Sequence, residues 1–191
     1  QNRIVFGLRY TEDEFASDVT NFFGLQKYLI QDELDETTGR LAYEHDIDGD
    51  TMVYVSYTKG FKPGGSNLTF GYPEDNEGFG AAPAPQLIFP IFESEMIDAY
   101  EVGLKTDFMD GRMRANLSAF TYDYDNLQFQ STDPDVYRGG VANIPESEMK
   151  GVELELIGLI SESLSMDLRM GYLDTEIVSY YEALDNVKTE L

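Results

Sequence analysis

Apolar and polar side chains alternate with a period of two along several segments of this chain, and this alternation limits the possible folds more than any other feature. In the segment 164–172, one set of alternate positions is apolar and the other carries Asp167 and Arg169. The segments 100–108 and 151–156 repeat the pattern, and in each of them the charged residues stay on one side. A period of two is typical of β-strands with two unlike faces. The sequence therefore predicts an all-β protein whose strands have one apolar and one polar face.

Further strands are predicted around this set. Residues 4–10 and 51–61 alternate in the same way, and residues 40–47 do so less regularly. The run 112–130 alternates at first and then loses its phase near residues 120–124, where we expect a β-bulge. Together these segments make about seven strands.

The predicted connections are of two kinds that alternate along the chain. Short polar turns are expected at 48–50, 109–111 and 161–163. Long connections are expected at 11–38, 62–94, 131–147 and 178–191. Long unstructured loops are uncommon in compact soluble domains, whereas outer-membrane barrels join their strands by short periplasmic turns and longer extracellular loops. We therefore expect an antiparallel transmembrane β-meander, and the alternative is a soluble antiparallel sandwich whose apolar faces form a core.

The composition restricts the possible partners and locations. The formal net charge is −23 and the isoelectric point is near 4.1, which argues against nucleic acid because binding to phosphates requires clustered Lys and Arg. The sequence has no run of about 18 apolar residues, so a transmembrane helix is excluded, while barrel strands need only about 9–11 residues. The chain has no cysteine, which excludes disulfides and thiolate metal sites.

Several stretches of the sequence resemble the TonB-dependent receptors of Gram-negative outer membranes. They are VYVSYTKGFKPGGSN (53–67), EMIDAYEVGLKTDFMDGRMRANLSAFTYDYDNLQFQ (95–130), NIPESEMKGVELEL (143–156) and LSMDLRMGYLDTEI (164–177). The opening NRIVFGLRYTED is similar to another strand of that family, and the order of all five stretches is the order of the family's barrel strands.

The resemblance implies a barrel of 22 strands, filled by an N-terminal plug, that imports scarce nutrients such as ferric siderophores or cobalamin. Residues 1–191 are then expected to be a partial barrel domain with about seven of those strands, without the plug and without the C-terminal strand. The implied location is the outer membrane of a Gram-negative bacterium. The implied partners are outer-membrane lipid, a small-molecule or metal-chelate cargo and, through the plug, the TonB complex. A transporter of this kind is not an enzyme and needs no cofactor.

We expect two groups of residues to meet the cargo or the plug. The polar faces of the predicted strands would line the lumen with Arg9, Tyr54, Glu101, Lys105, Glu153, Glu155, Asp167 and Arg169. The long connection 62–94 supplies three aromatic residues that could stack on a ligand, namely Phe70, Tyr72 and Phe79. The first long connection is strongly acidic and would repel an anionic cargo, so a neutral or cationic cargo is expected.

Two alternatives for the function stay open on the sequence. The first is a self-contained eight-stranded outer-membrane barrel with a structural or adhesive role. The second is a β-rich hydrolase that uses carboxylate pairs such as Glu153 and Glu155, which share a strand face. Ion pairs of these carboxylates with Lys105, Arg9 or Arg169 on neighbouring strands, in a lumen, are the simpler explanation, and we expect them.

Two further motifs are expected to have no catalytic or metal-binding role. The lone histidine, His45, is expected at an exposed strand end. The segment Asp46-Ile-Asp48-Gly49-Asp50 is expected to form a polar hairpin turn, because its glycine falls fourth whereas an EF-hand loop requires glycine at its sixth position.

Overall fold

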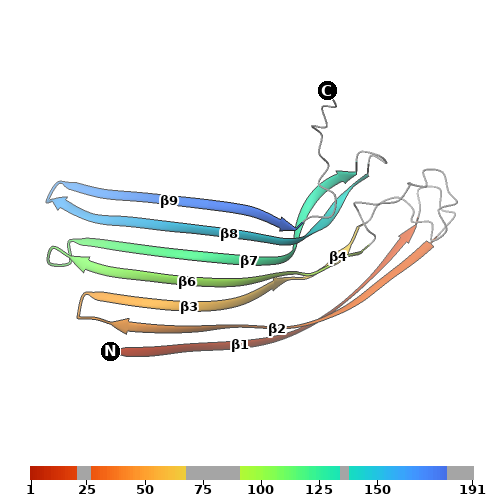
Figure 1. Ribbon diagram of the computed structural model, residues 1–191, viewed down its shortest axis with the longest axis horizontal. Helices are drawn as coiled ribbons and strands as arrows, with labels where there is room; N and C mark the ends of the chain where they lie inside the picture. Colours follow the sequence, from red (N-terminus) through yellow and green to blue (C-terminus); the bar gives the residue numbers. More distant parts are fainter. Residues whose placement is uncertain (21–26, 68–90, 134–137, 180–191) are drawn as a thin grey trace, which may run out of the picture.

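The computed structural model describes residues 1–20, 27–67, 91–133 and 138–179. Most of these residues belong to one antiparallel sheet with the strand order β1-β2-β3-β6-β7-β8-β9 (Figure 1). Its strands are β1 (Asn2–Thr20), β2 (Lys27–Asp46), β3 (Thr51–Lys62), β6 (Glu95–Phe108), β7 (Met113–Asp133), β8 (Arg138–Ser161) and β9 (Leu164–Ser179). This seven-stranded meander confirms the predicted fold class. Among the described residues, no helix is long and apolar enough to cross a membrane.

A second, two-stranded sheet lies inside the connection 62–94 that was expected to have no regular structure. Its strands are β4 (Gly65–Ser66) and β5 (Ile91–Phe92), which pair antiparallel. Two residues are too few to show a period in the sequence, so alternation could not have revealed these strands.

The pairing of the strands confirms that the large sheet has two unlike faces. Directly opposite residues of antiparallel strands project on the same face. One such row crosses the sheet as Tyr43, Val55, Val102, Ala119, Val152 and Tyr172. We call the face with this row the apolar face, and the face with Glu101 and Gly103 the polar face.

Large side chains of the apolar face are exposed. Ile4, Phe6 and Leu8 of β1 have relative exposures of 75%, 71% and 69%, and Val55 and Val102 in the middle of the sheet are more than half exposed. In a soluble sandwich these side chains would be covered by a second sheet. The exposure of the apolar face therefore contradicts the sandwich alternative.

The short connections lie together at one end of the sheet (Figure 1). Residues 47–50, 109–112 and 162–163 join the successive hairpins there, as predicted. In the second turn Met109 and Asp110 have φ angles of 57° and 58°, and Gly111 has 73°. Only the glycine adopts this left-handed conformation without steric cost. We call this end of the sheet the short-turn end and the opposite end the long-hairpin end.

Two of the long connections predicted from the sequence, 11–38 and 131–147, are largely strand. β1 pairs with β2 without a break as far as Thr20, and β7 pairs with β8 as far as Asp133. Both faces of these outer segments carry mainly polar residues, so the sequence has no alternation there. Backbone pairing does not need alternation, which is why the periodicity underestimated the length of these strands.

The β-bulge expected near residues 120–124 does not occur. Met113 to Asp125 of β7 pair in constant register with β6 on one side and with β8 on the other. The phase of the sequence changes because Phe120, Tyr122 and Tyr124 place aromatic rings on the polar face. Irregular pairing is found between β8 and β9 instead.

The strands β1 and β9 are the two opposite edges of the large sheet (Figure 1). Within the described residues β1 pairs with β2 alone, and β9 pairs with β8 alone. A closed barrel requires its first and last strands to pair. The open sheet therefore disfavours the self-contained small barrel and fits a segment of a larger one.

Candidate functional site

The polar face carries all the strand residues that were predicted to line a lumen. The register places Arg9, Tyr54, Glu101, Lys105, Glu153, Glu155, Asp167 and Arg169 on it. Five of them line one hollow of about 430 Å³ in the inner part of the sheet, namely Tyr54, Lys105, Glu153, Glu155 and Arg169. Arg9 lies apart on the edge strand β1, opposite Thr38. The predicted loop residues Phe70, Tyr72 and Phe79 lie outside the described residues.

Tyr54 is fixed on the polar face by three residues of β6. Its hydroxyl donates a hydrogen bond to Glu101 Oε1. Its ring lies against Gly103, the residue directly opposite, where a Cβ would come within 2.4 Å of the ring. Lys105 Nζ lies 5.5 Å from the ring centroid, within the range of a cation–π interaction. The missing side chain of Gly103 therefore gives the ring the space that brings its hydroxyl to Glu101.

A second polar group connects β7, β8 and β9. Glu155 accepts a hydrogen bond of 2.7 Å from Asn116 Nδ2 and lies 3.1 Å from Arg169 Nε. Arg169 also lies 3.1 Å from Asp167. The pairing of Glu155 with a cation on the neighbouring strand confirms the expectation for this carboxylate. A carboxylate held in this way does not resemble a free catalytic acid, which weakens the hydrolase alternative.

Not every charge of the polar face is balanced by the sheet itself. Within the described ranges, neither Lys105 nor Glu153 makes an ion pair, and Glu101 is hydrogen-bonded to a neutral tyrosine. Charged groups avoid a large desolvation cost only if they meet water or a polar partner. The polar face is therefore suited to a wet lumen or to contact with polar protein surface.

Three aromatic residues on the polar face of β7 were missed by the sequence analysis. Phe120, Tyr122 and Tyr124 lie at alternate positions, and we call them the aromatic ladder. The rings of Phe120 and Tyr122 are stacked, with centroids 4.6 Å apart and planes inclined by 22°. Gly151, directly opposite Phe120, leaves room for that ring, because a Cβ there would lie 2.4 Å from it. Their spacing of two residues was a usable signal that the assumed bulge obscured.

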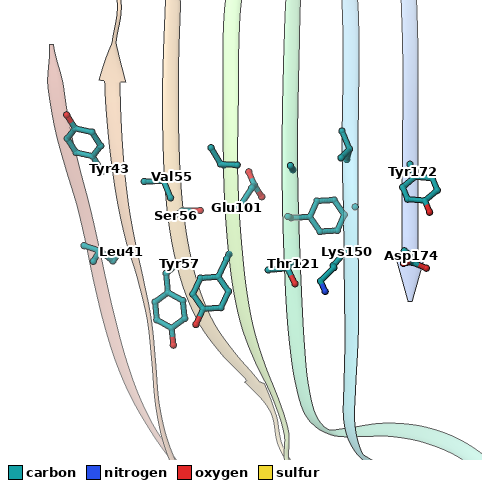
Figure 2. A pocket seen from close by; sticks show the side chains of 16 residues that line it. Leu41, Tyr43, Val55, Ser56, Tyr57, Glu101, Thr121, Lys150, Tyr172 and Asp174 are labelled. Carbon is teal, nitrogen blue, oxygen red and sulfur yellow. The ribbon is translucent and has the colours of Figure 1, made fainter. Parts of the chain in front are cut away.

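The apolar face contains a wider hollow of about 780 Å³ (Figure 2). Leu41, Tyr43, Val55 and Tyr172 are among the side chains around it, and Lys150 and Asp174 are among its few charged residues. Figure 2 shows these side chains distributed over neighbouring strands, not gathered around one point. Such an open and apolar surface lacks the convergent polar groups that orient a polar ligand. It is suited to contact with hydrocarbon chains.

A row of charged residues borders the apolar face toward the long-hairpin end. Its members lie directly opposite one another on five strands and are Lys59, Asp98, Asp123, Glu148 and Glu176. The row before it contains Tyr57 and Tyr100, whose ring centroids are 5.1 Å apart. On β6 the apolar face extends from Tyr100 to Phe108, about 26 Å along the strand at about 3.3 Å per residue. The apolar face is thus a band that ends at this row on β3, β6 and β7, whereas on β8 and β9 the charged residues begin one row earlier, with Lys150 and Asp174.

The acidic turn between β2 and β3 forms a hairpin, as predicted. Asp48 Oδ1 accepts a 2.9 Å hydrogen bond from the Asp50 amide, which holds the pKa of the Asp48 carboxyl below its ordinary value. Asp46 is bound by Arg3 at 2.7 Å. His45 Nδ1 lies 2.6 Å from Asn2 Oδ1 at the same end of the sheet. Within the described part of the chain, no three metal-binding side chains come together.

The sequence also matches a protein family and individual relatives. A sequence model described as TonB dependent receptor-like, beta-barrel, matches residues 3–189. The probable TonB-dependent siderophore receptor PiuA of Acinetobacter baumannii is 27% identical over 171 residues, which are 90% of this chain and 21% of that protein. The ferric-pyoverdine BN7/BN8 receptor of Pseudomonas putida is 30% identical over 118 residues, which are 62% of this chain and 12% of the receptor. The chain thus spans about a fifth or less of the length of these relatives.

Solved structures show the same fold. The ferric yersiniabactin uptake receptor FyuA of Yersinia pestis aligns with a TM-score of 0.69 at 19% identity, covering 92% of this chain and 24% of that one. The siderophore receptor PiuA of Acinetobacter baumannii aligns with a TM-score of 0.66 at 23% identity, covering 92% and 23%. Since the family model covers almost the whole chain and the open sheet matches a part of these structures, the chain belongs to the TonB-dependent receptor-like β-barrel family.

Proposed function

We propose that this chain forms part of the wall of a receptor that imports a ferric siderophore or a related metal chelate across the outer membrane of a Gram-negative bacterium. Its strands would be part of a 22-strand barrel closed by other segments of the natural protein. An N-terminal plug and the TonB complex of the inner membrane would supply the gated, energy-dependent step. In this proposal the chain is a transporter wall and has no reaction chemistry of its own.

The apolar band is the observation that supports membrane insertion best. Its side chains are exposed although they are large, and the charged row with Asp98 and Glu148 marks where the band ends. Outer-membrane barrels have an outward apolar band about 25 Å tall. In this orientation the short-turn end is periplasmic and the long-hairpin end is extracellular. The hollow of the apolar face would then be filled by lipid acyl chains.

The polar face would line the lumen. Glu101, Lys105 and Glu153 are charges that the sheet leaves available to the plug or to water. The aromatic ladder begins beside this region and continues toward the long-hairpin end, so a cargo that enters from outside would reach Tyr124 first. Aromatic rings bind flat or cationic groups by stacking. In this proposal Glu101, Lys105 and Glu153 contact the plug, whereas the aromatic ladder contacts the cargo.

The class of cargo follows from the relatives and from the charge of the chain. The names of two relatives refer to siderophores or ferric pyoverdine, and a third is the metal-pseudopaline receptor CntO of Pseudomonas aeruginosa. These names favour a metal chelate over cobalamin. The net charge of −23 disfavours a strongly anionic complex, so we propose a neutral or cationic chelate.

Uptake of labelled iron tests this proposal. The natural protein that carries this chain is expressed in a bacterium without its own ferric-siderophore receptors, and cells receive ferric chelates of different charge or labelled cobalamin. We expect energy-dependent uptake of at least one neutral or cationic ferric chelate. The double variant Tyr122→Ala/Tyr124→Ala is expected to lose at least tenfold in chelate affinity, whereas Tyr172→Ala on the apolar face keeps it. Uptake of cobalamin alone, or equal effects of both changes, contradicts the proposal.

A further inference from the structure

The small sheet β4–β5 is attached to the outer part of the β7–β8 hairpin by side-chain amides. We use the term stem for residues 62–67 together with residues 91–95, and the term outer hairpin for residues 126–133 together with 138–145. The stem leaves β3 and returns to β6, whereas the outer hairpin belongs to strands further along the sheet. The stem contacts β7, which is the neighbour of β6 in the large sheet, and it also contacts β8, which pairs with neither β3 nor β6.

Two asparagines form the central contacts, and they do so in opposite directions. Asn67 of the stem donates from Nδ2 to the Val141 carbonyl at 2.7 Å and accepts from the Val141 amide at 2.8 Å. Asn143 of the outer hairpin accepts from the Glu93 amide at 2.8 Å and donates to the Glu93 carbonyl at 3.0 Å. In each case one side-chain amide binds both main-chain groups of one residue. An asparagine amide can do this because it carries a donor and an acceptor side by side, as a peptide group does.

Further polar contacts surround this pair. Gln128 Nε2 donates to the carbonyls of Pro63 at 2.9 Å and Glu93 at 3.1 Å, and the Gln128 amide donates to Glu95 Oε2 at 2.8 Å. Asn126 Nδ2 donates to Glu93 Oε2 at 2.7 Å. Gln128 and Asn143 are directly opposite each other in the hairpin, so both strands of the hairpin hold the same residue of the stem.

The backbone of the outer hairpin changes where these contacts begin. Asn126 has a φ angle of 56°, and the pairing of β7 with β8 passes from Asp125 to Leu127 without including it. Asparagine tolerates this left-handed conformation better than most residues. Pro145, at the matching position of β8, has no amide hydrogen to offer. Figure 1 shows the ends of β7 and β8 turning away from the direction of their inner parts.

The burial of Asn67 indicates that this contact is specific. Its relative exposure is 5%, although it lies just beyond the short strand β4. A buried amide that lost its partners would remain desolvated without hydrogen bonds, which is unfavourable. If the stem moved away from the outer hairpin, Asn67, Asn143 and Gln128 would all lose their hydrogen-bond partners. Separation of the stem from the outer hairpin would therefore break all of these hydrogen bonds together.

We propose that the stem and the outer hairpin form one cooperative unit, held by the reciprocal amide pairs of Asn67 with Val141 and Asn143 with Glu93. The unit starts at Asn126, two residues beyond Tyr124 of the aromatic ladder. It thereby sets the outer boundary of the ladder and transmits a displacement of the stem to the hairpin. This inference rests on the contacts alone, and it holds whether or not the cargo is a metal chelate.

Hydrogen exchange of single amides tests the proposal in the natural protein that carries this chain. Asn67→Ala removes the acceptor for the Val141 amide, and Asn143→Ala removes the acceptor for the Glu93 amide. If the unit is cooperative, each substitution accelerates exchange at both amides at least tenfold, although it removes the side-chain acceptor of only one of them. The amides of residues 115–121 report that the large sheet remains folded.

Asn116→Ala is the matched control, because this asparagine of the polar face binds Glu155 and not the stem. It is expected to leave exchange at Val141 and Glu93 unchanged. Asn143→Asp keeps the acceptor for Glu93 and serves if the alanine variant does not fold; it is expected to accelerate both amides by a smaller factor. Acceleration of only the directly affected amide in each variant would overturn the proposal, as would unprotected amides in the unaltered protein.

Discussion

The ring of Tyr54 in β3 lies against Gly103 in β6, so closely that a Cβ at position 103 would come within 2.4 Å of the ring. The same relationship links Phe120 of β7 with Gly151 of β8. In both pairs the glycine lies directly opposite the aromatic residue on the polar face. Aromatic rings across from glycines fix register and fill the space that a missing side chain leaves. These pairs therefore help to determine how β3 aligns with β6 and how β7 aligns with β8.

A methyl group at position 103 is expected to displace the Tyr54 ring. We predict that Gly103→Ala lowers the free energy of unfolding by about 1–3 kcal/mol, the usual cost of forcing extra volume into a packed site. Gly171→Ala is the matched control, because a Cβ there meets nothing within 4 Å. Urea titration of the natural protein refolded in lipid vesicles measures both. Equal effects of the two substitutions would show that the close approach has no energetic importance.

A positive charge discriminates between the two faces of β7. Leu117 lies on the apolar face and Ser118 beside it lies on the polar face. If the apolar face meets lipid, Leu117→Arg destabilises the folded state by about 2–4 kcal/mol, whereas Ser118→Arg has a much smaller effect. Unfolding in vesicles compares the two variants. If the apolar face met water instead, Leu117→Arg would not be more destabilising than Ser118→Arg. Leu117 is already 44% exposed, so an arginine there would be solvated.

The ion pairs of Arg169 are expected to contribute little to stability. Its side chain is 67% exposed, and exposed pairs contribute up to about 1 kcal/mol. We predict that Arg169→Gln lowers the free energy of unfolding by less than about 1 kcal/mol, and that 1 M salt reduces the difference further. A loss of several kcal/mol would mean that Glu155 is desolvated in the assembled barrel.

The turn between β2 and β3 gives a prediction about acid. The pKa of Asp48 is lower in the folded chain than the ordinary value of 3.8, chiefly because the Asp50 amide donates a hydrogen bond to the carboxylate. The stabilisation is therefore complete above the ordinary pKa and is lost as the pH falls through the lower, folded value. Asp48→Asn should reduce the fall in stability between pH 5 and pH 2.5, and the effect should be small because the turn is exposed. An unchanged pH profile would count against this role of Asp48.

Much of the fold could be predicted from the sequence because the apolar band imposes a period of two. Where one face is apolar, as in 100–108 and 164–172, the structure confirms both the predicted strands and the face on which each residue lies. Beyond the band both faces are polar, so the same strands continue as hairpins that alternation cannot detect. The aromatic ladder was missed for the opposite reason, because Phe120 and Tyr122 are apolar residues on the polar face.

The candidate site could be predicted only as a set of residues on one face. Alternation placed Tyr54, Glu101 and Glu155 correctly on the polar face. It could not show that Tyr54 reaches Glu101, since this depends on the space above Gly103, or that Glu155 meets Arg169, since this depends on the register of β8 with β9. The contact of Asn67 with Val141 joins residues 74 positions apart, and no local pattern signals it.

The central claim is that these strands cross a lipid bilayer with the apolar face outward, and single-cysteine scanning of β7 tests it most directly. The chain has no cysteine of its own, so each introduced thiol can carry the only spin label on these strands. Labels at residues 113–120 and 123–126 are compared for their accessibility to oxygen, which partitions into lipid, and to a water-soluble nickel complex. The account predicts alternation up to Phe120, with oxygen favoured at 115, 117 and 119, and access to the nickel complex at every position beyond Asp123. Uniform access to the nickel complex along the whole strand, or oxygen favoured at 116 and 118, would contradict it.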